Sequence, residues 1–565
     1  MLRYRKSCLV LPFALFVCST AWGQLGRSFS RPSDYRRAGL EVAWTSQAEL
    51  DRDRSAAANA HLQLLGLDSY EDYLANSYPV YEVKYDKGIR RFSAIDLGRN
   101  GKAIGEAEAA RLAEKEQIRL NARGYKTTIE EKRIPRSVLY IQTNSGTVQA
   151  IDAENGQTLW AILVGRPNYQ TLNPTANDQY VSVINGSDLY LLDRKTGEQV
   201  WKRPLQNNPT VGPKLTQKQV FAPATNGQVE GHWLPSEDDP VREPDQLPYR
   251  RPTWYYRSDS QVTAPITATP RTISWPTEGG RVYVANIEKK PEVQYMVRTS
   301  GPIHGQTVFV EPDRLAVGSS DGFIYCLNET DGEIQWQYAT GEPILESLFS
   351  DGERIYAITE LGNLHAVGTS DGFQQWLATG IKRIVAASAT RLYVIDEQGM
   401  MHGLDPKTGG RVMSLNISGY DLPIVNRLTD RIYLAASDGT IKCLREIQAP
   451  LPTIHASLPQ PSTDKTKQAG QQTTDAGPSA DEFSPPGNDA GNRNDPAADT
   501  MDDDPFGAGD GADPFGAGDG EDPFGAGGAD EGDPFGAGDG EDPFGAGDGD
   551  EGNPFGAGDG EDPFG

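Results

Sequence analysis

The feature that most constrains the fold is a hairpin unit that returns eight times along the chain. Each copy places a glycine-containing turn between strand-like segments, as in "SGTVQAIDAENGQTLW" at residues 145–160. The turn glycines stand at positions 146, 186, 227, 280, 322, 362, 399 and 439. Because a lone hairpin is only marginally stable in water, units that recur at this period are expected to pack on one another.

The local chemistry of each copy predicts antiparallel sheets. Strands of period two alternate with turns of the type Asp-x-x-Thr-Gly, in which a polar side chain bonds the backbone and glycine adopts a positive φ. Trp160, Trp201, Trp336 and Trp376 each follow a turn glycine by four residues. We interpret these tryptophans as the contacts between successive sheets. The prediction is an all-β fold, an eight-bladed β-propeller of four-stranded antiparallel blades over residues 137–447.

The last copy lacks its tryptophan strand, which predicts how the ring closes. It runs into proline-rich sequence after "TIKCL" and leaves an unpaired edge. The segment "AGLEVAWTSQ" at residues 38–47 resembles the other tryptophan strands, with Trp44 in the tryptophan position. We expect this segment to complete the eighth blade and to join the two ends of the propeller.

The rest of the N-terminal segment, residues 24–136, is expected to be partly helical. A capping-box pattern of Ser46 and Glu49 precedes a stretch that ends at Gly66, which predicts a first helix. The stretch "GEAEAARLAEKEQIRLNARG", ending at Gly124, predicts a second helix that lies against the ring or presents its charges to a partner.

Residues 1–23 read as a signal peptide. A basic start, an apolar stretch and small residues before Gln24 match the export pattern. Val17 stands where a lipobox before Cys18 would need a small residue, which argues against lipidation. The protein is therefore expected to be exported and to be periplasmic, cell-envelope-associated or secreted, with no transmembrane segment in the mature chain.

The C-terminal part lacks the composition of a packed domain. Residues 448–500 form a proline-rich linker, and residues 501–565 carry 20 acidic residues, no Lys or Arg, and seven Pro-Phe-Gly units. We expect both stretches to be disordered and of low complexity, with the acidic tail binding cations weakly. Its phenylalanines are candidate contacts of a multivalent tail: Phe506, Phe515, Phe524, Phe535, Phe544, Phe555 and Phe564.

At this point the repeat carries a family resemblance. The motif "LYIQTNSGTVQAIDAENGQTLW" resembles the repeat of quinoprotein-like (PQQ-like) propellers, over about residues 137–447. That family includes quinone-dependent alcohol dehydrogenases and the propeller lipoprotein of the outer-membrane β-barrel assembly machinery. The resemblance implies the propeller fold and leaves catalysis and binding open.

The residues favour binding over catalysis. Dehydrogenases of the family use adjacent cysteines beside the quinone, whereas Cys326 and Cys443 stand far apart in matching strands. The acids Asp152, Asp193 and Asp405 recur at turn positions, which indicates backbone capping. We therefore predict a non-enzymatic protein-interaction scaffold with no cofactor, metal or catalytic residue. The alternative is a quinone- or metal-dependent oxidoreductase with atypical site residues.

The third repeat holds the other candidate partner site. Its period is longer than the others, and the extra sequence mixes acids and prolines with cations and aromatics that are typical of protein interfaces. The candidates are Arg250, Arg251, Trp254, Tyr255, Tyr256 and Arg257. For Trp254 or Tyr256 the alternative is that the ring fills the blade-packing position. The partners expected are other proteins of the cell envelope, and the absence of a basic cluster argues against nucleic acid.

Overall fold

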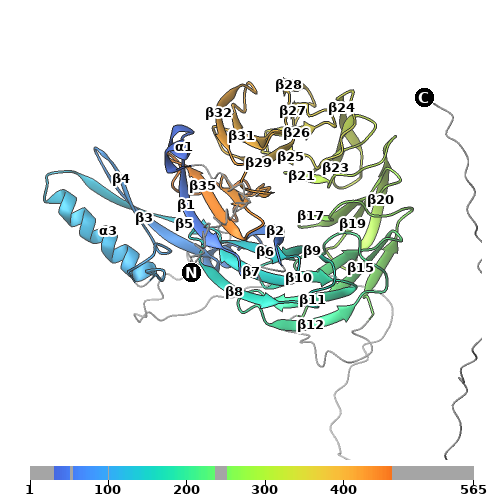
Figure 1. Cartoon of the computed structure of the whole chain (residues 1–565), viewed down its shortest axis with the longest axis horizontal. Helices are drawn as coiled ribbons and strands as arrows, with labels where there is room; N and C mark the ends of the chain where they lie inside the picture. The colour runs from blue at the N-terminus through green and yellow to red at the C-terminus, as the bar shows by residue number, and fades with distance from the viewer. Residues whose placement is uncertain (1–30, 51–54, 100, 236–250, 461–565) are drawn as a thin grey trace, which may run out of the picture. The chain divides into compact units, whose positions relative to one another are not determined.

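The computed structural model describes residues 31–50, 55–99, 101–235 and 251–460. Within them, eight four-stranded antiparallel sheets follow one another round a ring, as Figure 1 shows. The predicted eight-bladed propeller is confirmed. The signal segment, most of the linker, the acidic tail and Arg250 lie outside the described residues.

Each blade is a meander whose first strand lines the channel and whose last strand forms the outer edge. Blade 1 consists of β2 (Ala57–Leu64), β6 (Ser137–Thr143), β7 (Thr147–Asp152) and β8 (Thr158–Leu163), and blade 2 of β9 (Thr171–Ala176), β10 (Tyr180–Asn185), β11 (Asp188–Asp193) and β12 (Gln199–Pro204). Blade 3 consists of β13 (Lys214–Leu215), β14 (Gln219–Pro223), β15 (Gln228–Trp233) and β16 (Trp254–Arg257), and blade 4 of β17 (Thr267–Ala268), β18 (Thr272–Pro276), β19 (Arg281–Asn286) and β20 (Glu292–Arg298).

Blades 5 to 8 follow the same plan, except that the chain's first strand supplies the outer edge of blade 8. Blade 5 consists of β21 (Val308–Val310), β22 (Arg314–Gly318), β23 (Phe323–Asn328) and β24 (Ile334–Ala339), and blade 6 of β25 (Phe349–Ser350), β26 (Arg354–Ile358), β27 (Leu364–Gly368) and β28 (Gln374–Ala378). Blade 7 consists of β29 (Arg383–Ala387), β30 (Leu392–Ile395), β31 (Met400–Leu404) and β32 (Arg411–Asn416), and blade 8 of β33 (Leu422–Ile424), β34 (Ile432–Ala435), β35 (Thr440–Glu446) and β1 (Leu40–Gln47).

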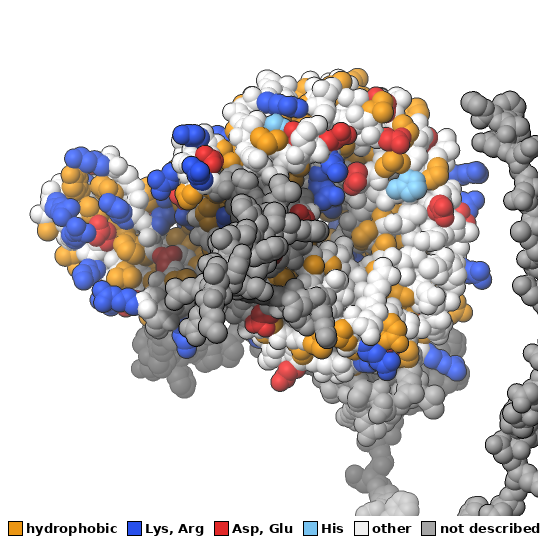
Figure 2. Space-filling model, in the orientation of Figure 1, with side chains coloured by type: hydrophobic (Ala, Val, Ile, Leu, Met, Phe, Trp, Pro, Cys, Tyr) orange, Lys and Arg blue, Asp and Glu red, His pale blue; other side chains and the backbone are white. Residues whose placement is uncertain are grey.

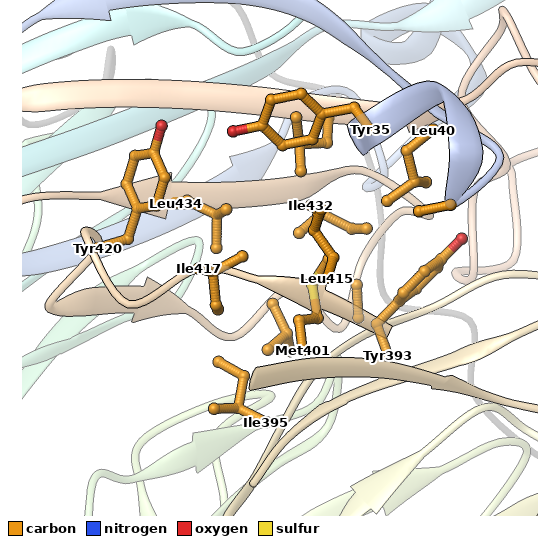
Figure 3. Close-up of a cluster of buried hydrophobic side chains, with 14 of the residues drawn as sticks. Tyr35, Leu40, Tyr393, Ile395, Met401, Leu415, Ile417, Tyr420, Ile432 and Leu434 are labelled. Carbon is orange, nitrogen blue, oxygen red and sulfur yellow. The ribbon is translucent and has the colours of Figure 1, made fainter. Parts of the chain in front are cut away.

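Strand β1 therefore joins the two ends of the ring. It pairs antiparallel with β35, and Trp44 lies opposite Cys443 in the register. The short helix α1 (Pro32–Arg37) precedes it. Figure 3 shows Tyr35 and Leu40 packed among side chains of blades 7 and 8, including Tyr393 and Ile432.

Tryptophans join four of the eight blades to the next blade through one repeated contact. The indole nitrogen of Trp44 donates to the carbonyl of Ala153 at 2.9 Å, in the turn of the following blade. In that turn Gly156 has a φ of +76°, and a Cβ there would stand 2.7 Å from the Trp44 ring. Glycine is therefore needed both for the turn and for the close approach of the ring. The same donation and glycine contact recur for Trp160, Trp336 and Trp376.

The junctions that blade 4 and blade 2 make with the blades after them depart from this pattern. In blade 4, Tyr295 replaces the tryptophan, donates from its hydroxyl to the carbonyl of Glu329 at 2.7 Å, and packs over Gly332. In blade 2, Trp201 is buried, but its indole nitrogen has no hydrogen-bond partner within the described chain. The guanidinium of Arg203 lies 4.3 Å from its ring centroid. The third blade has no Asp-x-x-Thr-Gly turn whose carbonyl could accept a hydrogen bond from the Trp201 indole.

The predicted first helix is wrong. Residues 57–64 form β2, the inner strand of blade 1, which pairs along its length with β6. The sequence "SAAANAHLQLLG" has high helix propensity, but Leu62 and Leu64 are buried by pairing within the blade. Tertiary pairing therefore overrides the local preference.

The segment between β2 and β6 forms a small module. It contains α2 (Tyr70–Ala75), β3 (Ser77–Tyr85), β4 (Gly88–Ser93), α3 (Glu106–Asn121) and β5 (Thr127–Pro135), with the strands in the order β4-β3-β5. The second predicted helix is confirmed as α3. It packs on this three-stranded sheet, with Ala113 and Leu120 against Val83, rather than on the ring.

Residues 448–460, expected to belong to a disordered linker, instead cross the inner turns of three blades. Ile454 pairs with Thr429 of blade 8, His455 contacts the Ala387 carbonyl of blade 7, and Ser457 bonds Glu311 of blade 5. We call residues 448–460 the C-terminal strap. Its prolines block a regular strand, so isolated backbone and side-chain contacts hold it.

A buried guanidinium ties the strap to the ring closure. Arg431 lies 3.3 Å from Glu154 of blade 1 and 3.1 Å from Asp430, and it donates to the carbonyls of Ala449 and Pro450. Burial raises the pKa values of the Glu154 and Asp430 carboxyls, while the guanidinium opposes that rise. The cluster thus holds blade 8, blade 1 and the strap together.

Replacing Trp44 by Ala should destabilise the whole propeller. The side chain is 7% exposed, and truncating a buried tryptophan costs about 3–5 kcal/mol of unfolding free energy. Urea unfolding measures this loss, and deletion of residues 38–47 should cost more because it also uncovers the β35 edge. Trp233→Ala is the matched control, since Trp233 is 40% exposed. Equal stability of the Trp44 and Trp233 variants would contradict this role of β1.

Replacing Arg431 by Met should cost about 3–5 kcal/mol at neutral pH, because two buried carboxylates lose their cation. Their pKa values, already raised by burial, should then rise further. A carboxyl whose pKa is raised in the folded state destabilises the fold when it is ionised. The loss of unfolding free energy in the variant should therefore become smaller as the pH falls and these carboxyls take up protons. Unfolding measured between about pH 7 and pH 5 tests this. Arg111→Met, which breaks an exposed pair on α3, should change little. A deficit independent of pH would refute the explanation.

Candidate interaction site

The long third repeat ends in β16, the outer strand of blade 3. Successive side chains of this strand alternate between two environments: Trp254 and Tyr256 are half-buried, whereas Tyr255 is 65% exposed and Arg257 is exposed. Arg251, just before the strand, is also exposed. The structure thus separates the candidate residues into a packed pair and an exposed set.

The packed pair belongs to the contact between blades 3 and 4. The Trp254 ring lies edge-on to Phe221, with 5.9 Å between centroids, and contacts Trp275. Tyr256 contacts Trp275 and Tyr283. These two aromatics fill the blade-packing position, which was the alternative interpretation. They make the strand rigid instead of offering rings to a partner.

The exposed set, Arg251, Tyr255 and Arg257, is called the blade 3 edge below. Among the described residues, strand β16 pairs with β15 and with no other strand, so within this part of the chain its other side has unpaired backbone donors and acceptors. The exposed tyrosine offers apolar contact area, and the two guanidinium groups offer positive charge. The strand edge beside them offers backbone hydrogen bonds. This set suits an extended, acidic segment of another protein.

Sequence reasoning missed two exposed apolar residues of blade 6. Phe373 is 73% exposed in the turn after β27, and Leu361 is 72% exposed in the turn before it. The signal was present in the repeat alignment. Phe373 follows its turn glycine where other copies have Gln157, Glu198 or Glu333, so an apolar residue replaces a polar one.

The groups that catalysis would use are engaged in the fold. Asp152 accepts from the backbone of Glu154 and Asn155, and Asp193 and Asp405 accept in the same way from their own turns, which confirms capping. Cys326 and Cys443 are buried free thiols, and burial raises the pKa of Cys326 to about 11. His402 lies 2.8 Å from Asp396 and bonds Ser414 within blade 7.

A cavity with a volume of about 940 Å³ lies where α2 meets blades 1 and 2. Asp178 lines it and accepts from the Gly66 backbone at 2.9 Å, while burial raises the pKa of this carboxyl to about 6. Arg136 and Arg194 line the same cavity. Over the part of the chain that is described, no three His, Cys, Asp or Glu side chains come together as a metal site. No described helix is both long and apolar enough to span a bilayer.

Comparison with known proteins places this geometry in a family. The family model described as outer membrane protein assembly factor BamB matches residues 117–232 and 269–435, half of the chain. The residues between the two matches, 233–268, contain the long connection of blade 3 and all of β16. The residues of the blade 3 edge therefore lie outside the two matched stretches.

Two curated relatives carry the same name as the family model. BamB of Alkalilimnicola ehrlichii is 32% identical over 119 residues, which is 18% of this chain and only 29% of that protein. BamB of Shewanella oneidensis is 22% identical over 319 residues, 54% of this chain and 68% of that protein. The crystal structure of BamB from Moraxella catarrhalis covers 55% of this chain and 91% of its own, at 17% identity and a TM-score of 0.45.

A designed protein, Ika8, also matches, over 54% of this chain and 92% of its own, at 15% identity and a TM-score of 0.42. The family model, by contrast, matches the repeats of this chain directly and over half of its length. The chain is thus a propeller that belongs to the outer membrane protein assembly factor BamB family.

Proposed function

We propose that the protein is an exported, non-enzymatic scaffold of the cell envelope that supports assembly of outer membrane proteins through protein contacts. The family carries the name of an assembly factor, which supports this role. The observation that carries the proposal for this chain is the blade 3 edge, an exposed strand edge whose half-buried aromatics pack against blade 4 on its other face.

The proposed contact is addition of a partner strand to β16. An added strand would bond the free backbone groups of β16, Tyr255 would cover its apolar residues, and Arg251 and Arg257 would pair with its acids. Arg250, outside the described residues, extends the cationic set in the sequence. The half-buried Trp254 and Tyr256 fix the strand before binding, so little ordering entropy is lost on association.

The acidic tail contributes a second, separate mode in this proposal. Its seven phenylalanines are apolar points on a chain of high negative charge, so each would bind weakly and several together would give avidity. Weak cation binding by its carboxylates is part of the same proposal. All seven phenylalanines lie outside the described residues.

The oxidoreductase alternative makes a different prediction. A bound quinone would give the purified protein a visible chromophore or quinone-dependent dye reduction. The buried thiols and the capped turn acids give no support to that chemistry. We therefore retain the binding function as the proposal.

The test replaces the exposed residues of the blade 3 edge together, Arg251→Ala, Tyr255→Ala and Arg257→Ala. In cells whose own copy has been removed, the triple variant should fail to restore the level of folded outer-membrane β-barrel protein. Its envelope partners should co-purify at least about tenfold less well, since an interface tyrosine or arginine is commonly worth more than 1.4 kcal/mol. Heat-modifiability on gels measures the β-barrel protein.

The matched control replaces two arginines and one apolar residue at another exposed site, with Ile89→Ala, Arg90→Ala and Arg99→Ala in the small module. Both triple variants should melt within a few degrees of the parent, because exposed substitutions cost about 0.5 kcal/mol or less each. Full restoration by the blade 3 variant would overturn the proposal. Equal loss in both variants would also overturn it, because the effect would then not belong to this edge.

A further inference from the structure

The inner strands of the propeller enclose a cavity that the proposed scaffold role does not use, called the channel cavity below. Its volume is about 640 Å³, and residues of β2, β9, β13 and β33 line it. Figure 2 shows the ring hollowed toward its centre. The volume lies in the range of about 300–1,000 Å³ that is usual for small-molecule sites. Because the lining comes from separate blades, this cavity forms only when the ring is closed.

Two cationic side chains line the channel cavity without a compensating acid. Lys214 lies on β13 of blade 3, and Arg427 lies between β33 and β34 of blade 8. The described part of the lining contains no Asp or Glu. Burial alone lowers the pKa values of Lys214 and Arg427, so no neighbouring carboxylate offsets the loss of water around them. A cation in this position is costly unless an anion pairs with it, and the cavity is therefore complementary to an anion.

Arg427 is held in place and still has hydrogen-bond donors to offer. It donates to the Leu348 carbonyl at 3.1 Å and to the side-chain oxygen of Gln306 at 3.5 Å. A guanidinium group has five N–H donors, so these two contacts leave others unused. The fixed position of the group lowers the entropy that would be lost when a ligand binds.

The rest of the polar lining is neutral. Burial and the nearby charge of Lys214 lower the pKa of His61 to about 4, so its imidazole is uncharged at neutral pH. Four side-chain amides complete the polar set: Asn59, Gln63, Asn173 and Gln306. An amide group both donates and accepts hydrogen bonds, as a hydroxyl group does. The amides therefore suit the hydroxyl groups of a ligand, while the two cations suit its acid group.

Aliphatic side chains make up much of the remaining lining. Leu62 and Leu64 come from blade 1, Ile266 precedes β17 of blade 4, and Ile424 and Leu428 belong to blade 8. An inorganic anion would leave both these side chains and the amides without contacts. The occupant that fits is an organic anion whose carbon skeleton carries hydroxyl groups.

We propose that the channel cavity binds a small hydroxylated anion, of the class of sugar phosphates and sugar acids. Lys214 pairs with the acid group, Arg427 donates to other oxygens of the ligand from three blades away, and the amides bond its hydroxyl groups. One ligand then contacts several blades at once, so binding also stabilises the closed ring. The inference goes beyond the proposed scaffold function and uses no residue of the blade 3 edge.

The test measures binding of glucose 6-phosphate and of glucuronate to the full chain by isothermal titration calorimetry. At least one of these two anionic sugars should bind saturably and raise the melting temperature, and the tighter one identifies the preferred acid group. Glucose lacks the acid group, and inorganic phosphate lacks the hydroxyl groups. Each of these two probes should bind at least about tenfold more weakly, since a hydrogen bond to a charged group commonly changes affinity by such a factor.

Lys214→Met should weaken binding of the anionic sugar at least about tenfold, because it removes the cation that pairs with the acid group. Lys214→Arg, which keeps the charge, should retain binding. Lys218→Met is the matched control, because Lys218 is exposed and donates to the Glu288 carbonyl at 3.1 Å. This control should bind the sugar as the parent does. Without ligand, Lys214→Met should not lower the melting temperature, since it removes an uncompensated charge.

Failure of both anionic sugars to bind overturns the proposal. So does binding that survives Lys214→Met, or glucose that binds as tightly as its phosphate. Inorganic phosphate that matches glucose 6-phosphate also overturns it, because the cavity would then hold an adventitious ion only. The triple variant of the blade 3 edge should still bind the sugar, so this proposal and the scaffold function can fail separately.

Discussion

The propeller depends on one repeated contact, a flat aromatic side chain of one blade lying over a turn glycine of the next. At the junctions led by Trp44, Trp160, Trp336 and Trp376, the ring packs on the glycine while its nitrogen donates to a carbonyl of the same turn. The hydrogen bond sets the position of the ring, and burial of the ring supplies most of the free energy. Sheets that would be marginal alone become parts of one cooperative structure.

Closure places one of these contacts between the two ends of the ring. Trp44 docks blade 8 on blade 1, although its strand is the first of the propeller and the rest of blade 8 is the last. Arg431 then links the same two blades and the C-terminal strap through Glu154, Asp430 and two carbonyls. The first strand of the propeller and the start of the strap are thus held at one junction. This arrangement protects a strand edge that would otherwise be exposed.

The repeat predicted the blades and their period because each hairpin carries its own turn chemistry. Prediction failed where tertiary contacts decide the local structure. The alanine-rich stretch around Asn59 would be helical by propensity, and only pairing with β6 makes it a strand. The strap contains Pro450 and Pro452 and has no periodicity, so its contacts with blades 5, 7 and 8 leave no local signal. In β16, successive side chains alternate between the blade-packing face and solvent, which decides that Trp254 and Tyr256 are packed and Tyr255 is exposed. The interruption of the third repeat concealed which of these residues would face the next blade.

The two candidate binding features differ in how visible they are in a sequence, and the difference follows from geometry. The blade 3 edge is local, so its cations and aromatics stand together in the chain. The basic side chains of the channel are His61, Lys214 and Arg427, each on an inner strand or turn of a different blade, and nothing in their neighbourhoods marks them. The inner strands surround one axis, so residues more than a hundred positions apart in the sequence converge there. The close-packed blade contacts prevent the walls from collapsing around these side chains. On this argument, the aromatic-on-glycine contacts that stabilise the propeller also hold basic residues of several blades together at its centre.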